Sequence, residues 1–253
     1  MTVDAAWIAA ALDQCSDRQL IAPGQDSVPS AVERVDSLLQ AWAVGFAARR
    51  HDVVSSNLVH GKRGLHDDEC AALLRALDSR LVHVDSAGYA RPIGLNAQPN
   101  RQPYALCCKS TTGVGVNLEY IIQLGVLAEM HSVLGWPLAS LRMELGEFDL
   151  AVAGEDGAPL LVIEAKARAR SSATDRDTLE KLIGAWLAYA EGPAPERGTN
   201  AANKYTELLR LTSAAPVNVG LVAAGARWWF RVERDDDRLD FRPIDAPQAS
   251  QIR

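Results

Sequence analysis

The sequence predicts an α/β protein, and two observations support that prediction. From about residue 115 onward, apolar residues recur first at helical spacing and then in short strand-like runs, in the order helix, three strands, helix, strand. Before about residue 105, the periodic stretches are mainly helical. We therefore expect two domains, a mainly helical accessory domain at residues 1–105 and an α/β domain at residues 106–253.

Composition narrows the class of protein. Of 253 residues, 48% are hydrophobic, as in an ordinary globular protein. No stretch approaches the roughly 18 apolar residues of a membrane span, and the first residues carry acids where a signal peptide carries basic residues. We expect a soluble cytoplasmic protein with no membrane partner. The four cysteines lack zinc-site spacing, and the net charge of −6 provides no overall attraction for nucleic acid.

The first half of the chain contains one clear helix and one clear hairpin. Apolar residues recur at helical spacing through residues 30–50, and a second helix is expected through residues 69–80. Residues 81–93 predict a hairpin that turns at Ser86 to Gly88. A helix followed by a two-stranded wing resembles a winged helix, which implies DNA reading, although a purely structural accessory domain is the alternative. Residues 94–105, rich in Asn, Gln and Pro, predict a linker.

The second half predicts the elements of an α/β domain in a regular order. A helix is expected over residues 116–135, two more helices over 177–192 and 202–211, and strands over the following ranges: 138–145, 147–153, 159–167, 217–225, 226–234 and 237–244. The Gly113-Val114-Gly115 segment lacks the lysine of a phosphate-binding loop, so we expect a turn or helix entry there.

Charged residues gather at one end of the hairpin formed by residues 147–167. Asp156-Gly157 is a dipeptide typical of a two-residue type I′ turn, which fixes the strand register. In that register Asp149 stands opposite Glu164, and Glu147 stands opposite Lys166. Both faces of the hairpin are otherwise largely apolar, so the presence of these charged residues requires a structural or functional explanation.

The opposed carboxylates point to a metal ion. Directly paired residues have Cβ atoms about 5 Å apart, where two carboxylates repel by roughly 3 kcal/mol at an effective dielectric of about 20. Mg²⁺ prefers hard oxygen ligands and removes this conflict. The alternative is a hairpin rim with a fortuitous salt bridge among Asp149, Glu164 and Lys166.

An acid on one strand followed by Glu164-Ala165-Lys166 on the next resembles the signature of the PD-(D/E)XK nuclease superfamily, with Phe148 in place of its proline. The resemblance covers roughly residues 112–245. It implies a restriction-endonuclease-like core, an αβββαβ mixed sheet flanked by helices. It also implies a Mg²⁺-dependent endodeoxyribonuclease, for which Mn²⁺ can substitute, that hydrolyses DNA phosphodiester bonds.

The same resemblance assigns roles to individual residues. Asp149, Glu164 and the carbonyl of Ala165 would bind the metal, and Lys166 would assist the attacking water. Glu119 on the first core helix would be a fourth catalytic and metal-binding residue, unless it is a solvated helix glutamate. For Glu147, a metal ligand and an ion-pair partner of Lys166 both remain open.

Other residues are candidates with plain alternatives. Arg168 and Arg170 follow the active strand and would contact DNA phosphates, or are solvated surface arginines. Lys181 or Lys204 would add a further basic group to the site. Trp228-Trp229 would stack on a base, although core packing is the more common role of such residues.

Two functions compete on these observations. One is a nuclease that acts on DNA, as a homodimer or with a partner protein. The other is a nuclease-fold DNA- or protein-binding regulatory protein without catalysis. The intact set of acids and lysine favours the enzyme.

Overall fold

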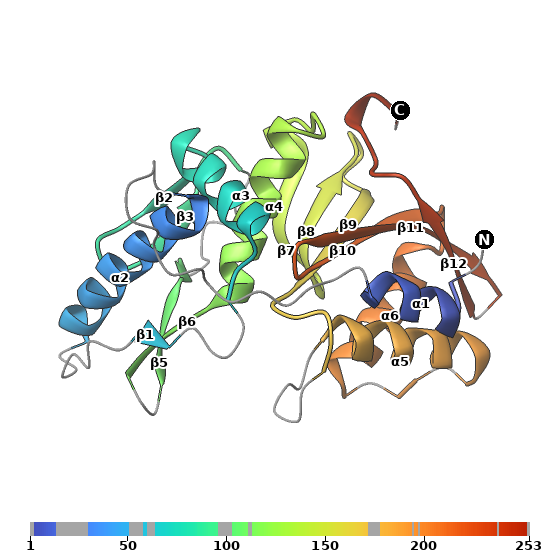
Figure 1. Cartoon of the computed structure of the whole chain (residues 1–253). Helices are drawn as coiled ribbons and strands as arrows, with labels where there is room; N and C mark the ends of the chain where they lie inside the picture. Colours follow the sequence, from blue (N-terminus) through green and yellow to red (C-terminus); the bar gives the residue numbers. More distant parts are fainter. Residues whose placement is uncertain are drawn as a thin grey trace. The chain divides into compact units, whose positions relative to one another are not determined.

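The computed structural model divides into two compact units (Figure 1). It describes residues 3–13, 30–50, 58–59, 64–95, 103–110, 113–171, 178–193, 195–196, 198–236 and 238–251. One unit combines residues 1–16 with residues 134–253, and the other comprises residues 17–133. The expected division at residues 105 and 106 therefore lies inside the second unit. Residues 96–102 of the expected linker lie outside the described residues.

A six-stranded mixed sheet forms the centre of the unit that contains residues 134–253. Its strand order is β12-β11-β10-β9-β8-β7. Only β9 and β10 are parallel; the other neighbours are antiparallel. The strands span these residues: β7 Leu141–Leu145, β8 Phe148–Ala153, β9 Pro159–Lys166, β10 Val217–Ala223, β11 Ala226–Asp235 and β12 Arg238–Ile244. The predicted α/β class, with a mixed sheet flanked by helices, is confirmed.

The parallel β9–β10 pair requires a crossover, which helices α5 (Leu179–Glu191) and α6 (Asn200–Leu211) supply. Each begins at a threonine whose hydroxyl accepts a hydrogen bond from the backbone, Thr178 for α5 and Thr199 for α6. Their apolar faces share one core with the sheet. Trp186 of this core stacks on Phe241 at 5.8 Å between ring centroids.

The N-terminal helix α1 (Ala5–Asp13) packs into the same core, which the sequence did not predict. The Val3 N–H donates to the Phe241 carbonyl at 3.4 Å, and the Trp7 ring meets the edge of Phe230 at 5.2 Å. In Figure 1, α1 lies beside α5. Two single-turn 3₁₀ helices, η1 (Leu138–Ser140) and η2 (Ala249–Gln251), complete the described elements of this unit.

The turn between β8 and β9 differs from the predicted type I′ turn. Gly157 has a positive φ of 81°, but Asp156 does not belong to the residues with positive φ, which type I′ requires. The loop has three residues instead of two, and the Gly154 N–H donates to the Ala158 carbonyl at 2.8 Å. A register shift between Val152 and Ala153 then offsets the extra loop residue.

Because of this compensation, the predicted register is confirmed further along the hairpin. Leu150 pairs with Ile163, and Ala151 pairs with Val162. The turn chemistry behind the prediction was wrong, yet the strands reach the same alignment. Continuing the ladder by one residue sets Asp149 against Glu164.

The described part of the unit of residues 17–133 contains three helices and two small sheets, of order β2-β3-β4 and β1-β6-β5. The elements are α2 Ala31–Arg49, β1 Leu58–Val59, α3 Asp67–Asp78, β2 Val82–Val84, β3 Tyr89–Pro92, β4 Tyr104–Ala105, β5 Cys107–Ser110, β6 Gly113–Val116 and α4 Leu118–Ser132. Helices α3 and α4 approach closely at Gly125, where an added Cβ would lie 3.0 Å from the Ala72 Cβ. The helix predicted over residues 116–135 therefore packs within this unit.

Several predictions for this unit are confirmed, and one is wrong. The helix α2 and the β2–β3 hairpin form where expected, with Gly88 at a positive φ of 73° in the turn. Strand β4 adds a third strand to that hairpin. Gly113 to Val116 form a strand rather than a turn, because they pair with both β5 and β1. Among the described residues, no helix is long and apolar enough to span a membrane.

Candidate metal and phosphate site

Glu164 is the centre of the candidate site. It lies on β9, between β8 and β10, and only 1% of its side chain is exposed. A carboxylate this deep in a sheet needs compensating charge, since removal of an ion from water costs several kcal/mol. The surrounding side chains supply that compensation.

Two lysines hold the Glu164 carboxylate, one on each oxygen. Lys166 Nζ lies 2.5 Å from Oε1, and Lys204 Nζ of α6 lies 2.7 Å from Oε2. Both lysine side chains are almost fully buried. Lys204 also donates to the Glu147 carbonyl and lies over the Phe148 ring, 5.2 Å from its centroid. Oε2 is buried, and its described partner is the ammonium group of Lys204.

Asp149 supplies the second carboxylate at this end of the hairpin. Its Oδ2 accepts a hydrogen bond of 2.7 Å from the Ala165 N–H, which fixes the half-buried side chain over β9. Asp149 and Glu164 each present a carboxylate oxygen within 4.8 Å of the other. The sequence therefore placed Asp149, Glu164 and Lys166 correctly together, with Ala165 between the last two.

The charges of Glu164, Asp149, Lys166 and Lys204 balance. Glu164 and Asp149 carry two negative charges, and Lys166 and Lys204 carry two positive charges. The donor set also includes hard carboxylate oxygens of the kind that Mg²⁺ prefers. A divalent cation beside Asp149 and Glu164 would make the group positive, which favours a phosphate.

A pocket of about 160 Å³ opens beside Lys166. It is lined by Lys166, Thr178, Lys181, Leu182, Thr199, Asn200 and Ala201. These residues include the N-cap threonines and first-turn residues of α5 and α6, so two helix N-termini meet there. Helix N-termini carry partial positive charge and unpaired N–H groups, which favour anions. The pocket is thus electrostatically suited to a phosphate next to the carboxylates.

The Glu147 side chain forms no ion pair with Lys166 among the described residues, and a metal-ligand role for it remains a prediction. Its side chain is exposed, and the structure uses its backbone carbonyl to accept from Lys204. The ion-pair partner of Lys166 is Glu164, its neighbour two residues back on the same strand. Side chains two residues apart on a strand share one face, so the sequence pattern alone places Glu164 and Lys166 on the same face of β9. The expected pairing across the hairpin instead set Glu147 opposite Lys166.

Arg168 and Arg170 are half-buried in the segment that leaves β9. The Arg168 carbonyl accepts from the Leu179 N–H at 3.3 Å, which fixes this segment to the start of α5. Hydrogen bonds from the Ser171 N–H and hydroxyl lower the pKa of Glu180, and the nearby charges of Arg170 and Lys181 add to this effect. Contact of the two arginines with phosphate remains a prediction.

Glu119 lies in the first turn of α4 and is half-buried. By contacts, α4 belongs to the unit of residues 17–133, whereas Asp149 and Glu164 belong to the other unit. Its place at the metal remains a prediction.

The two adjacent tryptophans belong to the core. Trp228 and Trp229 are each 8% exposed on β11. Trp229 lies across Gly220 of β10, where an added Cβ would be 2.4 Å from the indole Cζ3. The core interpretation is therefore confirmed, and base stacking by these rings is excluded by their burial.

Lys204 is the site residue that sequence reasoning failed to single out. The sequence offers Lys181 and Lys204 equally as a further basic group of the site. Only the structure distinguishes them, because Lys204 is buried against Glu164 and Lys181 is exposed. A signal was available, because Lys204, Leu208 and Leu211 recur at helical spacing on the apolar face of α6. A lysine on such a face requires a buried acid as its partner.

No family model, no curated protein and no solved structure matches this chain.

Proposed function

We propose that this protein is a metal-dependent nuclease of the PD-(D/E)XK type that hydrolyses DNA phosphodiester bonds. The observation that carries the proposal is the gathering of Asp149, Glu164 and Lys166 at one end of the β8–β9 hairpin. The topology supports it as well. Three antiparallel strands are followed by a helical crossover and a parallel fourth strand, as the resemblance implies.

The residues present fit a hard divalent cation. Asp149 and Glu164 offer neighbouring carboxylate oxygens within 4.8 Å of each other. Asp149, Glu164 and the Ala165 carbonyl would hold Mg²⁺ or Mn²⁺. When bound, the metal supplies Lewis-acid polarisation of the phosphate and a water of lowered pKa.

The protein residues have separate tasks in such a reaction. Lys166 lies between Glu164 and the pocket, so its ammonium group is placed to orient a water or to stabilise charge on a phosphate oxygen. Lys204 balances the Glu164 carboxylate from the opposite side and holds it in place. The N-termini of α5 and α6 offer N–H groups to a neighbouring phosphate. Arg168 and Arg170 would bind the DNA backbone on one side of the cut.

One observation favours the second candidate, a nuclease-fold DNA- or protein-binding regulatory protein without catalysis. Both oxygens of Glu164 already face an ammonium group, so the buried carboxylate is neutralised without a metal. A network of this kind also serves as a structural ion pair. The two functions differ in whether a metal binds and whether DNA is cut.

The test is cleavage of supercoiled and single-stranded DNA by the purified chain with Mg²⁺, Mn²⁺ or EDTA. We expect metal-dependent cutting that falls by at least about 100-fold in Asp149→Ala and Lys166→Ala, because each removes a group that acts in the transition state. Glu155→Ala is the matched control, since Glu155 is an exposed acid at the turn of the same hairpin.

The outcomes separate the candidates. Cutting that persists in Asp149→Ala would refute the assigned site. DNA binding without cutting under any metal condition, with no binding of Mn²⁺, would support the regulatory function instead.

A further inference from the structure

A second cluster of basic groups lies in the unit of residues 17–133, remote in sequence from the carboxylates. Arg49 and Arg50 end helix α2, and Arg91 lies on β3. All three side chains are exposed. A pocket of about 320 Å³ is lined by Arg49, Asp85, Tyr89, Arg91 and Pro103.

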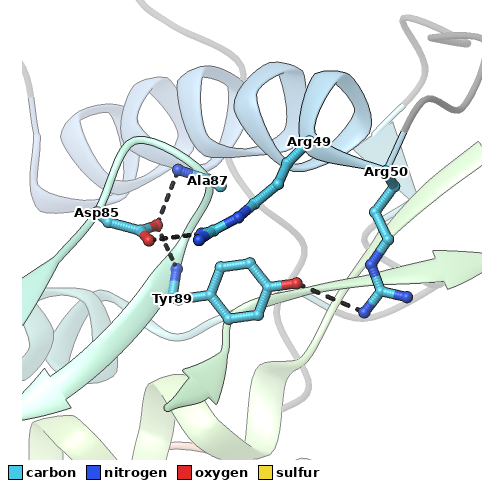
Figure 2. Close-up of polar contacts among 5 residues, drawn as sticks. All are labelled: Arg49, Arg50, Asp85, Ala87 and Tyr89. Carbon is cyan, nitrogen blue, oxygen red and sulfur yellow. Dashed lines mark hydrogen bonds and ion pairs between the residues drawn. The ribbon is translucent and has the colours of Figure 1, made fainter.

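The hairpin turn holds Arg49 in a defined position (Figure 2). Asp85 Oδ1 accepts from the Ala87 and Tyr89 N–H groups at 2.9 and 3.0 Å, which shapes the turn. Its other oxygen accepts from Arg49 Nη1 at 2.8 Å. Although burial acts in the opposite direction, the hydrogen bonds from Tyr89, Ala87 and Arg49 lower the pKa of Asp85. The same hydrogen bonds therefore favour the charged form of Asp85, which orients the Arg49 guanidinium.

Aromatic rings support both arginines. The Arg49 guanidinium lies over the Tyr89 ring, 4.9 Å from its centroid, and the Arg50 guanidinium lies over the Phe46 ring at 5.2 Å. Arg50 Nη2 also donates to the Tyr89 hydroxyl at 3.4 Å. Figure 2 shows both side chains reaching from the end of α2 toward Tyr89. Stacking and hydrogen bonding restrict the two arginine side chains before a ligand binds. Binding therefore costs less side-chain conformational entropy.

The arginines retain most of their donors. A guanidinium has five N–H donors, and among the described residues Arg49 uses one on Asp85 while Arg50 uses one on Tyr89. Arg49 and Arg91 against Asp85 leave the pocket with one excess positive charge, and the neighbouring Arg50, which donates to Tyr89, adds a second. Planar guanidinium groups match phosphate oxygens bidentately and are preferred for phosphate and nucleic-acid recognition.

We propose that this arginine pocket, lined by Arg49, Tyr89 and Arg91 with Arg50 beside it, binds a backbone phosphate of nucleic acid. The ligand is a phosphodiester rather than a base, because the groups that line the pocket are mainly charged and carry no pattern for reading base edges. The protein as a whole is acidic, so a local cluster of this kind is where attraction for a polyanion is concentrated. The inference deepens the proposed function by giving residues 17–133 a role in holding DNA.

The test measures binding instead of cleavage, so its failure is distinguishable from failure of the catalytic proposal. Anisotropy of a short fluorescein-labelled DNA duplex is titrated in EDTA with the full-length chain. The variants are Arg49→Gln, Arg91→Gln and their double variant. Arg34→Gln is the matched control, because Arg34 is an exposed arginine of the same unit with the same change of charge.

We expect each pocket variant to weaken binding about tenfold, as when one charge-assisted hydrogen bond to a phosphate is removed. The slope of log Kd against log salt should also fall by about one for each phosphate that the variant no longer neutralises. Arg34→Gln should bind like the wild type. Arg91→Gln protects the test against misfolding, since Arg91 contributes to the hairpin through its backbone pairing with His83 and its side chain has no described hydrogen bond or ion pair. Circular dichroism then confirms that each variant is folded.

Three results would overturn the inference. The first is equal DNA affinity in the wild type, both single variants and the double variant. The second is an absence of DNA binding by the wild type, whatever the cleavage assay shows. The third is binding of inorganic phosphate or a free nucleotide that depends on these arginines while DNA binding does not, which would make the site a small-anion pocket.

Discussion

The buried carboxylate of Glu164 allows a quantitative prediction that does not depend on catalysis. In Glu164→Ala, Lys166 and Lys204 keep side chains only 5% and 6% exposed but lose their common partner. At an effective dielectric of about 20, each attraction is worth about 4 kcal/mol at about 4 Å, and the repulsion between the lysines offsets part of the sum. Breaking a buried ion pair by removing one partner costs about 3–5 kcal/mol. We expect a loss of this size in the free energy of unfolding.

Tryptophan fluorescence during urea unfolding measures this loss of stability in the unit that contains Glu164. Five of the six tryptophans lie in residues 1–16 and 134–253, and only Trp42 lies in the other unit. The matched control is Glu233→Ala on β11. Glu233 forms ion pairs with Arg231 and Arg242, and its side chain is 34% exposed. Its removal should therefore lower the free energy of unfolding by less than about 1 kcal/mol.

A compensated variant tests the cause of the loss. Replacing Glu164, Lys166 and Lys204 together by Leu, Met and Met removes all three charges, and apolar replacements of buried ion pairs are often neutral or stabilising. We expect this variant to regain most of the stability that Glu164→Ala loses. The reasoning fails if Glu164→Ala unfolds at the same urea concentration as Glu233→Ala, because the carboxylate would then not be the shared partner of two buried ammonium groups.

Two further predictions concern packing and pH. Gly220→Ala should destabilise the sheet by about 1–3 kcal/mol, because the new Cβ would lie 2.4 Å from the Trp229 indole; equal thermal melts of variant and wild type would contradict this. The lowered pKa of Asp85 means that its hydrogen bonds stabilise the turn fully above the ordinary carboxyl pKa and are lost as the pH falls through the lowered value. Hydrogen exchange at the Ala87 and Tyr89 amides, corrected for the intrinsic rate, should therefore lose protection in acid, whereas Asp85→Ala should lack that protection at every pH.

The secondary structure of the α/β half was largely predictable because local patterns determine it. Alternating and helical apolar spacing located each strand from β7 to β12 and both crossover helices within a few residues. The hairpin register was predicted through the wrong turn type. Its success depends on a bulge after Val152 that no local signal announced. Register in a sheet buried on both faces is held by side-chain packing along the strands as well as by the turn.

Parts of the site were predictable for a similar reason. Asp149, Glu164 and Lys166 are charged residues on strands that otherwise read as buried, and such residues need a functional or structural partner. The position of Lys204 beside Glu164 was not predictable, because α6 and β9 are separated by a long stretch of chain. The same holds for the arginine pocket, since Arg49 at the end of α2 is far in sequence from the β2–β3 hairpin that carries Asp85 and Arg91.

The sequence by itself determined the class of fold, the order of its elements and the identity of the acids and lysine on the central hairpin. These features depend on the periodicity of neighbouring side chains, which a single sequence displays. The tertiary structure decided which unit the first helix joins, how the chain divides, and which distant cation completes the charge balance at Glu164. Those features depend on contacts between residues far apart in the chain, whose free energy comes from shared burial and is not encoded in any local pattern.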